Sequence, residues 1–108
     1  MPVYNKLVRD LIPQVIESTG KHFSTRILNN EEYIKELKNK SFEELEEYIK
    51  ADNDKDAIEE LADLLEIIHT LAECHGASFE KVEEVRQKKV EKRGGFKEKI
   101  FLIEVEDE

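Results

Sequence analysis

The chain has 108 residues, of which 39% are hydrophobic and 40% are charged, and its formal net charge is −9. This length predicts one domain, residues 1–108, and the hydrophobic content argues against disorder. The acidic charge argues against a non-specific binder of nucleic acid or of anionic membranes, because like charges repel. The single cysteine, Cys74, cannot form an intramolecular disulfide, and no apolar run suits a signal peptide or a membrane span. We therefore expect a soluble, cytoplasmic domain.

The N-terminal part of the chain predicts a short helix and a short strand. The helix covers residues 10–19, with Asp10 as its N-cap, Pro13 in its first turn and Gly20 after its end. Residues 22–28 alternate between apolar and polar side chains, which is typical of a strand.

A long helix is predicted next. Asn29 and Glu32 form a capping pair at its start, and the polar run at residues 51–55 ends it. The alternative is a break at residues 39–41, because a second capping box begins at Ser41.

Two more helices and a strand complete the predicted elements. The helix at residues 55–75 is the most apolar part of the chain and is expected at the centre of the fold, and Gly76 ends it. A fourth helix begins after Ser78 and ends near Arg93, before two glycines. Residues 96–105 alternate and predict a terminal strand. The fold class is mostly α: four helices with a small terminal β element.

Carboxylates recur in the same places on the two central helices. On a helical wheel at about 100° per residue, Glu44 and Glu60 lie within the apolar arcs, and Glu47 and Asp63 lie at the arc edges. Buried carboxylates repel one another unless a cation lies between them, and oxygen ligands suit Mg²⁺ or Mn²⁺. The alternative is a solvated acidic face, as most acidic runs form. A break at residues 39–41 would also move Glu44 to the edge of its arc.

Three blocks of sequence resemble one enzyme superfamily. Residues 43–47 (EELEE) and 60–63 (ELAD) resemble the EExxE…ExxD signature of the MazG-like all-α nucleoside triphosphate pyrophosphohydrolases. The opening YNKLVRD at 4–10 and the closing KRGGF at 92–96 resemble its phosphoribosyl-ATP pyrophosphohydrolase-like branch. The resemblance covers nearly the whole chain. It implies a four-helix MazG-like bundle that forms a homo-oligomer, a dimer or a tetramer, and Mg²⁺-dependent cleavage between the α- and β-phosphates of a nucleotide.

The resemblance also implies roles for single residues. The implied metal ligands are Glu44, Glu47, Glu60 and Asp63. Glu43 would be a supporting carboxylate or the base that orients water. No base-reading signature is present, so the identity of the nucleotide stays open.

Basic side chains are candidates for holding the phosphates of that substrate. On the fourth helix, Val82 and Val85 mark a predicted inward stripe that continues into cationic residues. The candidate substrate-binding residues are Lys6, Arg9, Lys89, Lys92 and Arg93. The sequence thus predicts a Mg²⁺-dependent nucleotide pyrophosphohydrolase. The alternatives are a non-catalytic helical oligomer that binds a nucleotide or a protein partner, and a scaffold with solvated acidic faces.

Overall fold

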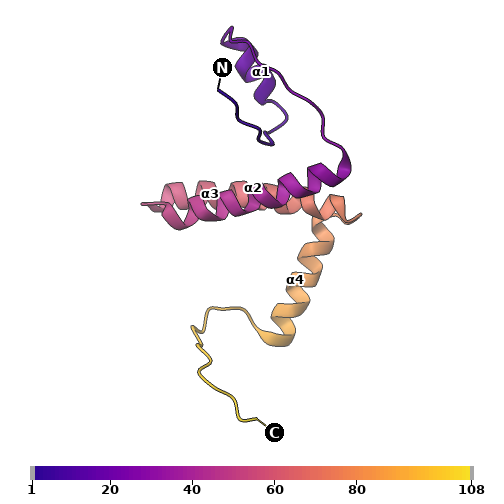
Figure 1. Cartoon of the computed structure of the whole chain (residues 1–108). Helices are drawn as coiled ribbons and strands as arrows, with labels where there is room; N and C mark the ends of the chain where they lie inside the picture. Colours follow the sequence, from indigo (N-terminus) through magenta and orange to yellow (C-terminus); the bar gives the residue numbers. More distant parts are fainter. Residues whose placement is uncertain (1, 108) are drawn as a thin grey trace.

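The computed structural model describes residues 2–107, which form four α-helices and no strand (Figure 1). The helices are α1 (Ile12–Ser18), α2 (Asn30–Lys50), α3 (Asp54–Cys74) and α4 (Phe79–Arg93). The predicted helical class is confirmed. Within the described residues, none of the helices combines the length and the apolar character needed to cross a membrane.

Helices α2 and α3 form an antiparallel hairpin, because only residues 51–53 connect them. An asparagine caps the start of each helix. The Asn29 side-chain oxygen accepts a hydrogen bond from the Glu32 backbone N–H at 2.9 Å, and the Asn53 oxygen accepts one from the Asp56 N–H at 2.8 Å. The two longest helices of the chain therefore begin where the sequence supplies an N-cap.

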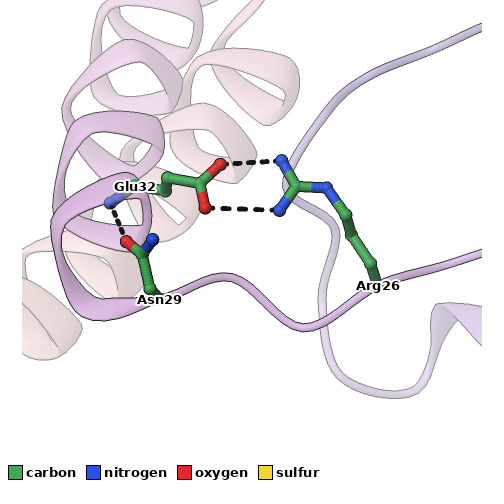
Figure 2. Close-up of polar contacts among 3 residues, drawn as sticks. All are labelled: Arg26, Asn29 and Glu32. Carbon is green, nitrogen blue, oxygen red and sulfur yellow. Dashed lines mark hydrogen bonds and ion pairs between the residues drawn. The ribbon is translucent and has the colours of Figure 1, made fainter.

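The start of α2 is also tied to the segment that precedes it (Figure 2). The Arg26 guanidinium donates two hydrogen bonds to the Glu32 carboxylate, at 2.7 and 3.3 Å. This contact holds the pKa of Glu32 below its ordinary value and raises the pKa of Arg26. The Glu32 backbone is thus engaged by Asn29 and its side chain by Arg26, which orients the chain as it enters the hairpin.

Helix α2 is continuous through residues 39–41, so the alternative of a break there is wrong. The Ser41 hydroxyl donates a hydrogen bond to the Lys38 backbone carbonyl at 2.6 Å instead of starting a new helix. Glu44 therefore keeps its place in the apolar arc of one long helix.

Gly76 ends α3 and allows the chain to turn into α4. Its φ of 71° lies in the left-handed region that favours glycine. Two bonds typical of this helix ending are present: the Gly76 N–H donates to the Glu73 carbonyl at 2.9 Å, and the Ala77 N–H donates to the Ala72 carbonyl at 3.0 Å. Ser78 then caps α4, as predicted.

The first helix is shorter than predicted. It begins at Ile12, and its N-cap position is Leu11, which makes no side-chain capping bond. The prediction of Asp10 as the N-cap is therefore wrong. Asp10 lies in the turn before the helix, where the Ile12 N–H donates to the Arg9 carbonyl at 3.0 Å.

The two predicted strands do not form within residues 2–107. The apolar side chains of these segments remain in solvent: Ile27 is 94% exposed and Phe101 is 87% exposed. An alternating pattern becomes a strand only when a second strand takes up its backbone hydrogen bonds, and residues 22–28 and 96–105 have no such partner in this part of the chain. The predicted terminal β element is therefore not confirmed.

Helix α4 packs only on the C-terminal part of α3. There the His69 ring stacks on the Phe79 ring, with centroids 3.7 Å apart and planes 5° apart. Beyond this contact α4 extends away from the hairpin, on the side opposite to α1 and the N-terminal segment (Figure 1).

The core lies within the hairpin and is small. The buried apolar side chains are Leu37, Ile67 and Ala72. The radius of gyration is 18.7 Å, whereas a compact domain of this length has a value of about 13 Å. One chain therefore presents a packed helix pair with extensions on both sides, and the predicted four-helix bundle is not confirmed within it.

Candidate metal centre

Three carboxylates of the hairpin lie together: Glu44 and Glu47 on α2, and Glu60 on α3. One oxygen from each lies within 4.8 Å of the other two. Glu44 is 9% exposed, and its Oε2 atom and the Oε2 atom of Glu60 are buried without a hydrogen-bond partner among residues 2–107. A buried polar atom without a partner costs free energy, so a cation beside these two oxygens would be favourable.

The cluster follows from helix geometry. Glu44 and Glu47 are three residues apart and so share one face of α2. The wheel places Glu44 and Glu60 in the arcs through which the two helices pack, and in the structure Glu44 is buried and Glu60 is half-buried. Because the helices are antiparallel neighbours, these two carboxylates face each other across the hairpin.

The protonation of the cluster reflects this crowding. The pKa of Glu44 is raised, chiefly because burial disfavours its charged form. The pKa of Glu60 is raised to about 7, first by its hydrogen bond with Glu44, then by burial and by the neighbouring Glu47. Both shifts have one physical cause, the crowding of negative charge in a partly buried place, and a cation there would relieve it.

Two basic residues of the N-terminal segment reach the same acidic face. The Arg9 guanidinium lies 2.7 Å from the Asp63 carboxylate, across 54 positions of sequence, and the Lys6 ammonium lies 4.0 Å from that of Glu43. Asp63, the fourth predicted ligand, is outside the group of three that lie within ligand distance. Sequence analysis assigned Lys6 and Arg9 to phosphate and gave no signal that they pair with the predicted acidic residues.

An open cavity of about 350 Å³ adjoins these contacts, where the N-terminal segment lies against α2. It is lined by Tyr4, Asn5, Lys6, Leu7, Glu36, Asn39, Lys40 and Glu43. Sequence analysis missed this cavity, because it forms between segments about 30 positions apart and its lining residues do not follow one helical face. A ligand in the cavity would lie beside Lys6 and Glu43, at the edge of the acidic face.

The other three predicted cations are not brought to this site within one chain. Lys89, Lys92 and Arg93 belong to the last part of α4, which extends away from the hairpin (Figure 1). Val85, expected on an inward stripe of this helix, is 42% exposed. Lys89, Lys92 and Arg93 are themselves exposed, so the predicted inward stripe is not inward at this end of α4.

Comparison with models of known protein families, with curated proteins and with solved structures finds no match for this chain. The chemistry of the site is therefore read from its own residues. Its clustered ligand atoms are all carboxylate oxygens, the donor set of a hard cation such as Mg²⁺ or Mn²⁺. The cluster could therefore hold a divalent cation, and Lys6 and Arg9 lie beside it in ion pairs with Glu43 and Asp63.

Proposed function

We propose that the protein is a Mg²⁺-dependent nucleotide pyrophosphohydrolase of the MazG-like superfamily, in its phosphoribosyl-ATP pyrophosphohydrolase-like branch. The reaction is hydrolysis of a nucleoside triphosphate, or a related nucleotide, between the α- and β-phosphates to give a monophosphate and pyrophosphate. The observation that carries this proposal is the cluster of Glu44, Glu47 and Glu60 with two buried oxygens that have no partner. The resemblance of three blocks in chain order supports it: residues 4–10, the paired acidic motifs at 43–47 and 60–63, and residues 92–96.

The crowding of the carboxylates favours a cation between them. Two unit charges about 4 Å apart repel by roughly 4 kcal/mol at an effective dielectric near 20. Glu44, Glu47 and Glu60 would hold Mg²⁺, with Mn²⁺ as the closest substitute, and Asp63 would complete the ligand set. When bound, Mg²⁺ neutralises charge on phosphate oxygens, which is the main requirement of phosphoanhydride hydrolysis.

The residues around the cluster supply the other parts of the reaction. Glu43 would orient the attacking water and accept its proton. Lys6 and Arg9, now paired with Glu43 and Asp63, would exchange these carboxylates for the phosphates of the substrate. This exchange would free Asp63 for the metal as the phosphates arrive.

The substrate would lie in the cavity between the N-terminal segment and α2, with its phosphates toward Glu43. We retain three more candidate phosphate ligands on the last part of α4: Lys89, Lys92 and Arg93. To bind the substrate of the same chain, this part of α4 would have to lie closer to the hairpin. The proposal includes a homo-oligomer, a dimer or tetramer, as the resemblance implies. A nucleotide substrate and one unpaired cysteine also suit the cytoplasm.

The test is release of pyrophosphate from a panel of nucleoside triphosphates in the presence of Mg²⁺. We expect release from at least one of them, reduced about 100-fold or more by Glu60→Gln, since even residues that only support metal ligands are worth 10- to 100-fold. Glu59→Gln is the matched control, because it removes the same charge from an exposed neighbour on α3. Wild-type release no higher than that of Glu60→Gln on every nucleotide would overturn the proposal.

The second candidate is a non-catalytic helical oligomer that binds a nucleotide or a protein partner at the acidic face. The large apolar surface left exposed by one chain favours a binding role of this kind. This candidate predicts that Mg²⁺ raises the melting temperature without any pyrophosphate release. The same panel therefore separates the two functions.

A further inference from the structure

The cavity between the N-terminal segment and α2 leads into the acidic cluster along one face of α2. Positions 36, 40, 43 and 47 follow one another at spacings of four, three and four residues, so they share this face. The first three line the cavity, and Glu47 belongs to the cluster. At about 1.5 Å per residue, Glu36 lies about 10 Å along the helix from Glu43, and we call its end of the cavity the far end.

The two ends of the cavity differ in the ligand that they suit. At the Glu43 end, the Lys6 ammonium lies 4.0 Å from the Glu43 carboxylate, and the proposed metal ligands follow on the same helix face. At the far end a phosphate would meet the negative charge of Glu36, which would repel it. A nucleotide with its phosphates toward Glu43 therefore places its uncharged nucleoside at the far end.

The far end presents a hydrogen-bond acceptor next to a donor. Glu36 and Lys40 are four residues apart, and both are half-buried in the wall of the cavity. A pair at this spacing often forms an ion pair, as Glu46 and Lys50 do at 2.8 Å on the same helix. Glu36 and Lys40 form none, with each other or with another residue of 2–107. Both oxygens of a carboxylate and the N–H groups of an ammonium are thus available to a ligand.

Two more side chains of the cavity wall suit a nucleobase. The Tyr4 side chain is 76% exposed, so its ring offers a free surface on which a base can stack. The Asn39 amide, on the same helix as Glu36, can both donate and accept hydrogen bonds. The cavity thus combines an aromatic surface with polar groups that can read the edge of a base.

Guanine is the base whose edge matches a carboxylate beside an ammonium. It carries two adjacent N–H donors, at N1 and N2, next to the O6 acceptor. Adenine and cytosine place one amino group beside a ring acceptor, and uracil and thymine have one N–H between two carbonyls. We infer, building on the proposed function, that the far end of the cavity binds the guanine of a nucleotide: Glu36 accepts from N1–H and N2–H, and Lys40 donates to O6.

The test is calorimetric binding of GMP and of AMP to the full chain, which measures base recognition without turnover. We expect GMP to bind about 10-fold more tightly or better, since a good bidentate contact to a base gives discrimination of this size. Glu36→Gln should remove the preference, because its amide accepts at one atom only. Tyr4→Ala should weaken both ligands alike, because stacking does not depend on the base. The matched control is Glu31→Gln, which removes the same charge from an exposed position of α2 outside the cavity and should keep the preference.

Far-UV circular dichroism establishes that each variant remains helical. Equal affinity for GMP and AMP, tighter binding of AMP, no binding of either, or a guanine preference that Glu36→Gln retains would each overturn the inference. Its failure is distinguishable from that of the proposed function. Pyrophosphate release at equal kcat/KM from GTP and ATP would leave the hydrolase and remove the guanine site, whereas a preference for GMP without release from any triphosphate would leave the guanine site and remove the hydrolase.

Discussion

The two sides of the α2–α3 hairpin differ in which groups they leave without partners. On one side, carboxylates crowd together and two of their oxygens are buried without a partner. On the other, large apolar side chains remain exposed to solvent: Phe42, Leu45 and Ile49 on α2, and Ile58, Leu61, Leu65 and Ile68 on α3. Both sides arise from the same helical period, since each helix places acidic residues at one edge of its apolar arc and aliphatic residues at the other. The comparison teaches that a helix pair can be well formed locally while its two sides leave different groups without partners, carboxylate oxygens on one side and apolar side chains on the other.

The largest expected effect is a loss of stability when the core between α2 and α3 is truncated. Leu37→Ala should lower the free energy of unfolding by about 2–5 kcal/mol, because Leu37 is 4% exposed and its removal leaves a cavity. Phe42→Ala is the comparison: it should cost less than about 0.5 kcal/mol, because Phe42 is 71% exposed. Chemical denaturation at a micromolar protein concentration measures both values. Equal and small costs for Leu37→Ala and Phe42→Ala would contradict the assignment of Leu37 to the core.

The next effect concerns the acidic side alone. Mg²⁺ at about 100 times its dissociation constant stabilises a protein by about 2.7 kcal/mol, which for a chain of this size raises the melting temperature by on the order of 10 °C. Glu44→Gln should abolish this rise, because it removes a charged ligand from the cluster. Glu46→Gln, an exposed carboxylate of the same helix that pairs with Lys50, should keep it. A wild-type melt that does not respond to millimolar Mg²⁺ would leave only the reading of a solvated acidic face.

The pH dependence should have opposite signs with and without metal. The pKa of Glu60 is about 7 in the folded chain against an ordinary value of 4.5, so the folded state binds its proton more tightly than the unfolded state. The stability that this proton contributes is fully present below pH 4.5 and is lost as the pH rises to about 7. Metal-free protein should therefore lose melting temperature across this interval, and Glu60→Gln should reduce the loss.

In Mg²⁺ the trend should reverse, because the cation binds only the deprotonated carboxylates. Stabilisation by Mg²⁺ should therefore grow as the pH rises through the pKa of Glu60, about 7. If the melting temperature of the wild type depends on pH in the same way with and without Mg²⁺, then the Glu60 proton and Mg²⁺ do not compete for the same carboxylates.

The smallest expected effect on stability is that of the N-terminal cations. Arg9→Ala should change the free energy of unfolding by only about 0–1 kcal/mol, since its pair with Asp63 is exposed to solvent. Under the proposed function it should still raise the KM for the nucleotide, because Arg9 would exchange Asp63 for a phosphate. Lys21→Ala, a change of the same charge away from the hairpin, is the control for both measurements. A KM for Arg9→Ala equal to that of Lys21→Ala would remove Arg9 from the substrate site.

Most of the helical structure is decided by local chemistry and could be predicted. Asn29 and Ser78 stand where helices begin, and Gly76 stands where one ends, because capping and left-handed turns depend only on a few neighbouring residues. The start of the short first helix was harder to predict. Asp is a common N-cap residue, but Asp10 lies in the turn before this helix. The strands could not be predicted from alternation alone, because a strand needs a partner and residues 22–28 and 96–105 have none in the described chain.

Residue spacing specifies which side chains share a helix face, including the inward position of Glu44 and Glu60, because helical period depends on spacing alone. Which faces meet depends on the packing of whole helices. The pairing of Arg9 with Asp63 joins residues 54 positions apart, and the cavity beside Glu43 forms between two separate segments. Packing likewise sets the course of α4 away from the hairpin and the exposure of apolar side chains such as Phe42 and Ile58. Such contacts depend on how whole helices lie against one another, and no local pattern of residues specifies that.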